Sequence, residues 1–228
     1  MSSCCRPGDY DKVFDEKHAR SKARAYARDG LTGDAKRIVE LIRGYWGERE
    51  AHTPSSGAQR GPRKYTVLEV GGGIGEIHLE LLKDGAARAV NVELATQYET
   101  VAAELIRERG LGDRVERRLG DFVREADGVP EADVVVMHRV VCCYPDAEAL
   151  VGAAADHARR HLVMTIPVDR WWIRWGIAVG NAVLALRRST FRGYAHATRV
   201  VISAAERRGM RLAKRRRGLI WQLIALER

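Results

Sequence analysis

The stretch that decides the fold reads VLEVGGGIGEIHLELL and covers residues 67–82. Its apolar start is typical of a buried strand. Glycines then stand at alternate positions, Gly71, Gly73 and Gly75, and an amphipathic helical pattern begins at once. Glycine lets the backbone turn sharply and approach a ligand, and the first turn of a helix presents unpaired N–H groups. The stretch therefore predicts a strand, a ligand-binding glycine loop and a helix, in that order.

Two common phosphate-binding loops do not match these residues. A dinucleotide-binding loop reads G-x-G-x-x-G, and its third glycine would stand at position 76, which is Glu76. A P-loop needs a G-K-S or G-K-T ending, which does not follow. The pattern thus disfavours a dinucleotide-dependent oxidoreductase and excludes a P-loop NTPase.

Short apolar runs alternate with amphipathic helical segments through the rest of the chain. Strand and helix alternating at this period favour a parallel sheet with helices on both faces. The last segment predicts two strands joined by a tight turn around Gly218. The other predicted strands cover residues 65–70, 87–93, 114–120, 132–140 and 161–167.

Composition divides the chain into three parts. Residues 1–50 predict a helical cap, with helices at 12–29 and 33–47. Residues 51–64 are rich in Gly, Pro and Ser and predict a flexible linker. Residues 65–228 form the main α/β domain, with a lid insertion at about 169–192.

The glycine loop and the acids after it resemble class I S-adenosylmethionine-dependent methyltransferases. The family's first motif is an acid followed by x-G-x-G-x-G, and Glu69 stands before the three glycines. A second acid ends the next strand in the family. Glu93 matches it, and a carboxylate there can accept both ribose hydroxyls. The family places an acid and a neighbouring group against the adenine, and Asp121 and Phe122 match them.

This resemblance implies a fold, a cofactor and a reaction. The fold is a seven-stranded Rossmann-like sheet of order 3-2-1-4-5-7-6 with an antiparallel last strand pair. The cofactor is S-adenosyl-L-methionine, which leaves as S-adenosyl-L-homocysteine. The acceptor is expected to be a small, hydrophobic and anionic molecule. RNA or protein methylation and noncatalytic cofactor binding remain alternatives, and oligomeric state is not assigned.

The residues after the fourth predicted strand read H-R-V-V-C-C-Y-P-D, at 138–146. They resemble an uncharacterised group of bacterial methyltransferases with the pattern H-R-V-x-C-C-Y-P-D. The family places residues near the reactive methyl group in this region, so His138 is our first candidate for a general base and Tyr144 the second. His138 is equally a candidate for the cofactor wall. Two cysteine pairs, at 4–5 and 142–143, suggest small buried side chains or a soft-metal site; we assign no metal.

The segment 171–188 combines tryptophans, aliphatic residues and arginines. It fits a core-packing helix, a lid over an apolar acceptor, or a helix that makes peripheral contact with a membrane. It is too short and polar to span a bilayer, and with no secretory signal pattern or Cys-x-x-Cys motif we expect a cytoplasmic protein.

Charge is distributed unevenly along the 228 residues, whose net charge is +9. The net charge is +5 for residues 1–64, −8 for residues 65–150 and +12 for residues 151–228. The acidic middle suits a cofactor with a sulfonium, an ammonium and hydroxyl groups. The basic end suits an anionic acceptor or surface. Nucleic-acid binding is disfavoured because no RNA-binding module accompanies the basic run at 214–217.

Overall fold

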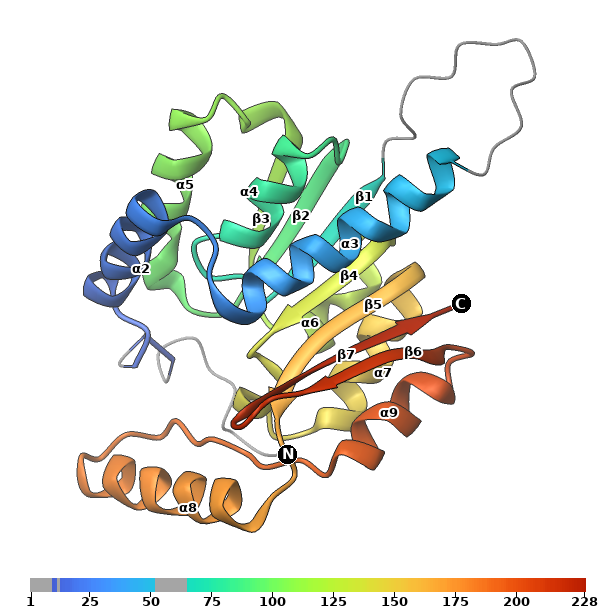
Figure 1. Cartoon of the computed structure of the whole chain (residues 1–228). Helices are drawn as coiled ribbons and strands as arrows, with labels where there is room; N and C mark the ends of the chain where they lie inside the picture. Colours follow the sequence, from blue (N-terminus) through green and yellow to red (C-terminus); the bar gives the residue numbers. More distant parts are fainter. Residues whose placement is uncertain (1–9, 12, 52–64) are drawn as a thin grey trace, which may run out of the picture.

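The computed structural model describes residues 10–11, 13–51 and 65–228, and its ribbon is shown in Figure 1. The described residues are organised around one sheet of seven strands in the order β3-β2-β1-β4-β5-β7-β6. The strands are β1 (Thr66–Val70), β2 (Arg88–Glu93), β3 (Val115–Leu119), β4 (Ala132–His138), β5 (Ala158–Pro167), β6 (Arg211–Arg217) and β7 (Trp221–Glu227).

Strand directions follow from the connections. Strands β1 to β5 pair in parallel, because each crossover carries helical turns. Strand β7 runs antiparallel to β6, since only residues 218–220 separate them, and it also pairs antiparallel with β5. The predicted α/β fold, its strand order and its antiparallel last pair are confirmed.

Two hydrophobic layers hold the sheet between its helices, because successive side chains of a strand point to opposite faces. Val67 and Val134 belong to one layer, and their neighbours Leu68 and Val135 belong to the other. The first layer is covered by α2 (Glu16–Asp29), α3 (Gly33–Ala51), α4 (Glu76–Lys83) and α5 (Glu99–Glu108). The second is covered by α6 (Phe122–Glu125), α7 (Ala147–His157) and α9 (Thr198–Glu206).

The two N-terminal helices, in the segment predicted as a helical cap, pack on the rest of the described residues. α3 contacts α4 and β5, and α2 contacts α5 and the turn before it. The N-cap of α2 is Asp15, whose carboxylate accepts a hydrogen bond from the His18 N–H at 2.8 Å. Gly30 ends the helix with a φ of 68°, a left-handed conformation that suits glycine. Of the predicted linker at 51–64, residues 52–64 lie outside the described residues.

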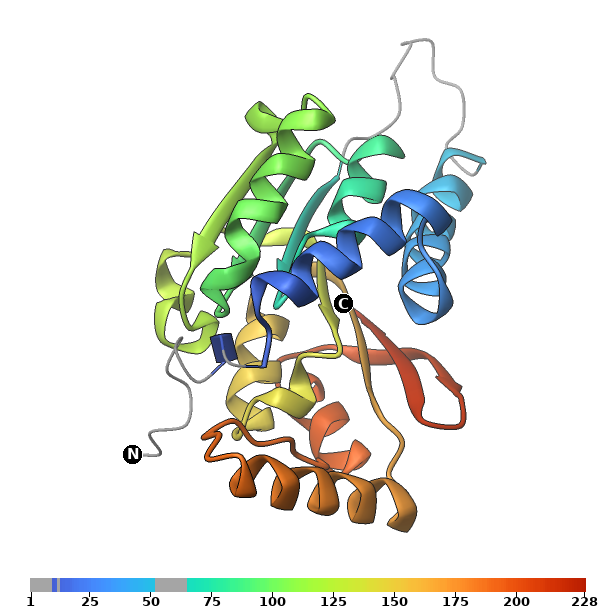
Figure 2. The ribbon, with the colours of Figure 1, turned by 90° about the vertical axis from the view of Figure 1, so that its left-hand side faces the viewer.

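Helix α8 (Trp171–Leu186) is different from the other helices. The structure describes it completely, and none of its residues is buried. It lies at the edge of the molecule in Figures 1 and 2, after the carboxyl end of β5, and the following segment runs back along it. It occupies most of the predicted lid insertion at about 169–192.

Candidate active site

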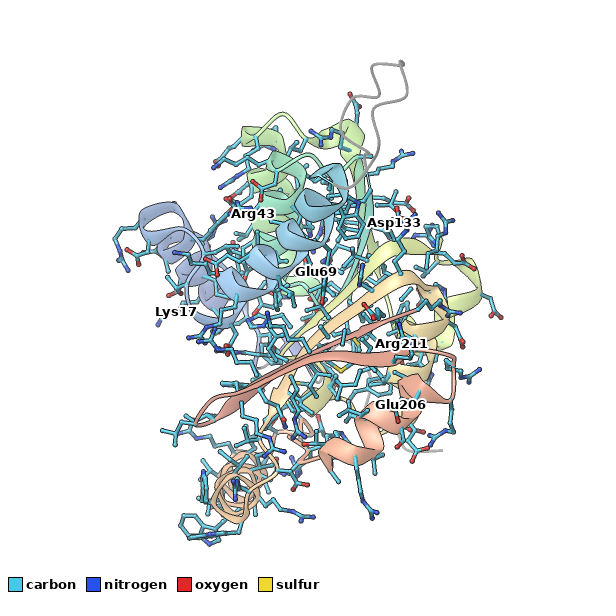
Figure 3. All side chains as sticks on the ribbon, turned by 45° about the vertical axis from the view of Figure 1, so that its right-hand side comes forward. Lys17, Arg43, Glu69, Asp133, Glu206 and Arg211 are labelled. Carbon is cyan, nitrogen blue, oxygen red and sulfur yellow. The ribbon has the colours of Figure 1, made fainter. Side chains whose placement is uncertain are left out.

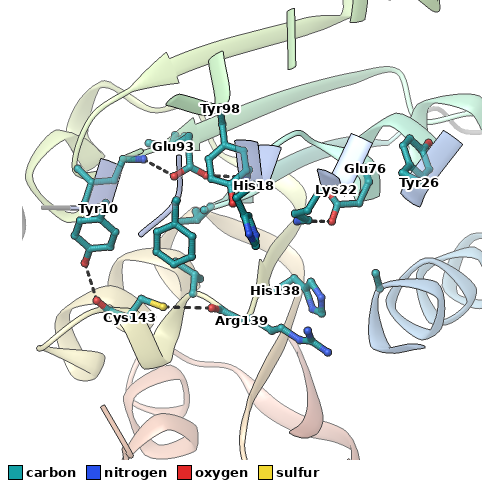
Figure 4. Close-up of a pocket in the computed structure, with 18 of the residues that line it drawn as sticks. Tyr10, His18, Lys22, Tyr26, Glu76, Glu93, Tyr98, His138, Arg139 and Cys143 are labelled. Atoms are coloured by element: carbon teal, nitrogen blue, oxygen red, sulfur yellow. Dashed lines mark hydrogen bonds and ion pairs between the residues drawn. The ribbon is translucent and has the colours of Figure 1, made fainter. Parts of the chain in front are cut away.

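A cavity of about 560 Å³ lies at the carboxyl ends of β1, β2 and β4 (Figure 4). In the sheet order, β1 lies between β2 and β4, so the connections leave β1 and β4 in opposite directions. Ligands of open α/β sheets bind at such a switch point, outside the carboxyl ends of the strands. The cavity is lined by the glycine loop, by the ends of β2 and β4, and by residues from the N-terminal helices.

The backbone of the glycine loop has a conformation that residues with a side chain rarely adopt. Gly71, Gly73 and Gly75 have φ values of 66°, 60° and 86°, which L-residues rarely adopt. A Cβ on Gly71 would come within 2.5 Å of Val140 Cγ2. A Cβ on Gly73 would lie 3.4 Å from the Tyr98 ring. Gly71 and Gly73 line the cavity, and Gly75 lies behind it against the His78 ring.

Glu93, at the end of β2, is a buried carboxylate on the cavity wall. Its Oε2 accepts the Gly73 N–H at 2.7 Å, and its Oε1 accepts the N–H groups of Leu94 and Ala95, both at 2.9 Å. Burial raises the pKa of Glu93, although these backbone N–H groups oppose the shift. The acid predicted from the sequence therefore connects the glycine loop to the end of β2.

Asp121 and Phe122 line the same cavity from the loop after β3. Asp121 is buried and caps α6 by accepting the Val123 N–H at 3.1 Å. It also accepts the Tyr144 hydroxyl, at 3.1 Å to Oδ1 and 3.3 Å to Oδ2. The structure thus brings Asp121 and Phe122 to the same cavity as Glu93, Gly71 and Gly73, and it ties the Tyr144 hydroxyl to a carboxylate.

Glu69 does not line the cavity. It is 1% exposed, and its Oε2 lies 2.6 Å from Nδ1 of His78, which is also fully buried. Figure 3 shows Glu69 in the interior, between the N-terminal helices and the sheet. A Cβ on Gly72 would collide with Asn91 and approach the Glu69 carboxylate. Glu69 therefore packs against Gly72 of the glycine loop and binds His78, outside the cavity lining.

His138, the last residue of β4, lines the cavity. Its Nδ1 lies 2.9 Å from the hydroxyl of Thr165, which also accepts the Arg139 N–H at 3.0 Å. Burial, followed by the charge of Arg139, lowers the pKa of His138 to about 4. The imidazole is therefore neutral at physiological pH.

The N-terminal helices contribute polar residues that the sequence alone did not reveal. Lys22 of α2 makes an ion pair with Glu76 at the start of α4, with Nζ 2.8 Å from Oε1. Both residues line the cavity. Glu76 Oε2 is buried and has no hydrogen-bond partner among the described residues. Position 76 was informative in the sequence only as a departure from the dinucleotide-binding pattern.

Arg139 follows His138 and has a φ of 59°, an uncommon value for a residue with a side chain. Such strain occurs at binding sites that the surrounding structure holds in place. Its guanidinium lies 4.7 Å from the centre of the Trp221 ring and 4.0 Å from the Asp34 carboxylate. Because Arg139 lines the cavity, it adds positive charge to a wall that also carries Lys22 and four acids.

The cysteines at 142–143 lie at the cavity edge, and Cys143 lines it. Their sulfur atoms are 3.9 Å apart, and both lie near the Arg139 carbonyl. The contact with Cys143 lowers the pKa of Cys142. The described residues contain no group of three His, Cys, Asp or Glu side chains that could hold a metal ion. Cys4 and Cys5 lie outside the described residues.

No protein-family model matches the sequence, and a search of curated proteins finds no match. Solved structures do resemble it. The magnesium protoporphyrin IX methyltransferase of Synechocystis PCC 6803, with bound SAH, has a TM-score of 0.66 at 17% identity, over 96% of this chain and 97% of that chain.

Two further solved structures come from other bacteria. An O-methyltransferase family protein from Burkholderia thailandensis has a TM-score of 0.62 at 19% identity, over 95% of this chain and 63% of that chain. An O-methyltransferase family 2 protein from Planctomyces limnophilus, in complex with apigenin, has a TM-score of 0.55 at 18% identity, over 83% of this chain and 61% of that chain. The chain has the fold of class I S-adenosylmethionine-dependent methyltransferases.

Proposed function

We propose that this protein is a methyltransferase that uses S-adenosyl-L-methionine, releases S-adenosyl-L-homocysteine and acts on a small, apolar and anionic molecule. The observation that carries the proposal is the cradle formed by Glu93 and the glycine loop. A buried carboxylate is fixed beside a loop in which Gly71 has no space for a side chain. The shared methyltransferase fold supports this assignment.

The cradle fits the hydroxyl-rich part of this cofactor. A carboxylate has about four acceptor sites, and backbone N–H groups occupy three of those on Glu93. One site on Oε2 therefore remains for one ribose hydroxyl. From the sequence, Glu93 was expected to accept both ribose hydroxyls. Asp121 and Phe122 line the same cavity from the loop after β3, and they suit the amino group and the face of the adenine.

The charged end of the cofactor also has a matching group. Glu76 Oε2 is a buried acceptor on the cavity wall without a partner among the described residues. Leaving such an atom unpaired costs about 1–3 kcal/mol, and more for a charged group. The ammonium of the methionine part would supply the missing hydrogen bond. We therefore assign Glu76 to the amino-acid end of the cofactor.

The acceptor would lie between the N-terminal helices and the end of β4. Tyr10 and Phe14 provide an aromatic wall, and Arg139 provides the positive charge. Arg139 is half exposed and held by a cation–π contact with Trp221, so it remains available to a carboxylate or phosphate. This combination supports an acceptor that is both apolar and anionic.

The cofactor supplies a methyl group on a sulfonium, which is already activated for transfer. The protein then has to align the acceptor and exclude water, and the N-terminal helices that line the cavity serve this purpose. His138 is neutral and lines the cavity. In the tautomer whose Nδ1–H donates to the Thr165 hydroxyl, Nε2 carries the lone pair that would take an acceptor proton. Tyr144 donates to Asp121, so we assign it to positioning that carboxylate.

Two measurements test this function. Calorimetry with S-adenosylhomocysteine and with NAD should show binding of the first only. Cell extract incubated with the protein and methyl-labelled cofactor should then show label in the small-molecule fraction. Label in RNA or protein would favour the macromolecular alternative, and binding without any transfer would favour a noncatalytic cofactor-binding protein. Binding of NAD in place of S-adenosylhomocysteine would refute the proposal.

A further inference from the structure

Large hydrophobic side chains are exposed mainly on one surface. Ten such side chains are exposed in the described part of the chain, and eight of them belong to α8 or to the turn between β6 and β7. On α8, Trp171, Trp175 and Leu186 are 75%, 68% and 85% exposed. In the turn, Leu219 and Ile220 are 78% and 51% exposed. We call α8 and this turn the α8 surface.

The two parts of the α8 surface are adjacent. The Val168 N–H donates to the Ile220 carbonyl at 2.8 Å, which places the turn beside the start of α8. Trp172 and Leu219 line the same shallow depression. Figures 1 and 2 both show α8 at the edge of the molecule, and in Figure 3 its side chains project outward from the helix. The turn therefore continues the apolar surface at the start of α8.

Helix α8 is attached to the protein by its opposite face. Asn181 donates to the Gly193 carbonyl at 2.9 Å and accepts the Gly193 N–H at 2.8 Å. Ile177 and Leu184 are partly buried on the same face, and Leu184 packs against the core. This face holds the helix in place, so its exposed tryptophans are not needed for its packing.

The charge around the α8 surface is almost entirely positive. Residues 168–200 contain six arginines and a single acid, Asp169. The strand leading into the turn adds Lys214 and three arginines at 215–217. Arg170, Arg199, Arg215 and Arg217 all line the depression beside Trp172.

We infer that the α8 surface binds the headgroups and outer acyl region of an anionic lipid bilayer. An interfacial helix combines tryptophan and aliphatic residues on one face with basic residues around it. Helix α8 supplies the apolar residues and Arg174, and the neighbouring segments supply the other basic residues. Nucleic acid fits less well, because bases stack on aromatic rings and not on aliphatic side chains such as Val179, Val183 and Leu186. No helix among the described residues combines the length and apolar composition needed to cross a bilayer, which agrees with surface binding.

The α8 surface is connected to the cavity by the segment that follows it. Phe191 packs edge-on against Tyr10, with ring centres 5.4 Å apart. The Tyr194 N–H donates to the Cys142 carbonyl at 2.7 Å, and His196 Nε2 lies 2.8 Å from the Tyr144 carbonyl. This segment therefore joins the attached face of α8 to the cavity edge. Delivery of an apolar acceptor from the bilayer rests on the proposed methyltransferase function, whereas lipid binding itself does not.

Co-sedimentation with vesicles tests the inference. The full-length protein should bind phosphatidylcholine vesicles that contain phosphatidylglycerol, and should bind pure phosphatidylcholine much more weakly. Raising the salt concentration should weaken binding, because the arginines contribute through charge. The tryptophan emission should shift to shorter wavelength on binding, since three of the five tryptophans lie on α8. This result is independent of methyl transfer, so the two proposals can fail separately.

Matched variants identify the surface. Val179→Ser with Val183→Ser removes two side chains that are 43% and 42% exposed, and should lower vesicle binding. Leu119→Ser with Leu212→Ser removes two that are 46% and 42% exposed elsewhere, and should leave it unchanged. Replacing Arg174 by Gln should weaken binding about fivefold. Arg88→Gln, an exposed arginine at the amino end of β2, should have no effect.

Three outcomes would overturn the inference. The first is no binding to anionic vesicles at low salt. The second is equal loss in the two serine pairs. The third is a dimer in solution that the Val179→Ser, Val183→Ser protein no longer forms, which would assign the α8 surface to a second copy of this chain. Circular dichroism of each variant would show that the fold is retained, as expected for exposed positions.

Discussion

The Glu93 carboxylate accepts the backbone N–H of Gly73 at a distance of 2.7 Å. This hydrogen bond joins the end of β2 to the glycine loop that follows β1, although the two residues are 20 positions apart. Both residues line the cavity, and the hydrogen bond fixes the loop against the end of β2. A preorganised site loses less conformational entropy when a ligand binds.

Gly71→Ala should abolish cofactor binding and destabilise the protein. The left-handed backbone alone costs an alanine about 1–2 kcal/mol. The new Cβ would also come within 2.5 Å of Val140 Cγ2. Gly110→Ala is the control, because Gly110 has a φ of 64° and its Cβ would meet no described atom within 4 Å. Chemical denaturation and calorimetry should show the smaller stability loss, with normal binding, in the control. Equal effects of the two substitutions would argue against close packing at the loop.

The Lys22–Glu76 ion pair should stabilise the contact between α2 and the glycine loop. Lys22→Met retains the aliphatic stem but leaves the largely buried Glu76 carboxylate without its partner, which should cost about 1–3 kcal/mol. Glu76→Gln in the same chain should recover part of this loss, so a double-mutant cycle should give a favourable coupling energy. Lys17→Met, on the exposed side of α2, is the control. A coupling energy of zero would show that the pair contributes nothing.

Acidification should remove stability through His138. Burial lowers its pKa to about 4 from an ordinary value of 6.5. Between these values the unfolded chain binds a proton at His138 that the folded chain does not. Stability therefore falls as the pH decreases from 6.5 to 4, by up to about 3 kcal/mol. Urea unfolding across this range should show a weaker pH dependence in His138→Gln than in the wild type. A parallel pH dependence of stability in the two proteins would mean that His138 titrates normally.

The low pKa of His138 also has a consequence for activity. His138 should stay neutral between pH 6 and 8, so it should add no ionisation step to the rate profile in that range. A nuclear magnetic resonance titration of the His138 ring would measure its pKa directly.

The fold was predictable because local patterns and burial agree. The runs around Leu68 and Val135 are apolar on both sides of the strand, as expected for central parallel strands covered by helices on both faces. The glycines were informative for a second reason, because positive φ values at these positions disfavour most other residues. Glu93, Asp121 and Phe122 were predicted from the resemblance to the methyltransferase family, and they lie at or just after strand ends, where the side chains of a parallel sheet converge.

The remaining site residues depend on contacts between distant parts of the chain. Glu69 fits the family motif, but its partner His78 directs the carboxylate beneath the loop and away from the cavity. Lys22 reaches Glu76 only because α2 packs over the glycine loop, which no local pattern reveals. The segment 171–188 was ambiguous in sequence, since an exposed helix with aromatic residues and a core helix have similar composition. The structure places α8 outside the cavity lining, so its predicted role as a lid stays a prediction.

Calorimetric titration of S-adenosylhomocysteine into the wild type, Glu93→Gln and Glu108→Gln tests the central claim most directly. Glu108 is an exposed acid on α5 and serves as the control. A hydrogen bond to a charged group contributes about 1.5–3 kcal/mol, so Glu93→Gln should weaken binding about 10- to 100-fold, with Glu108→Gln unchanged. No binding to the wild type, or equal affinity in all three proteins, would contradict the assignment of this cavity to the cofactor.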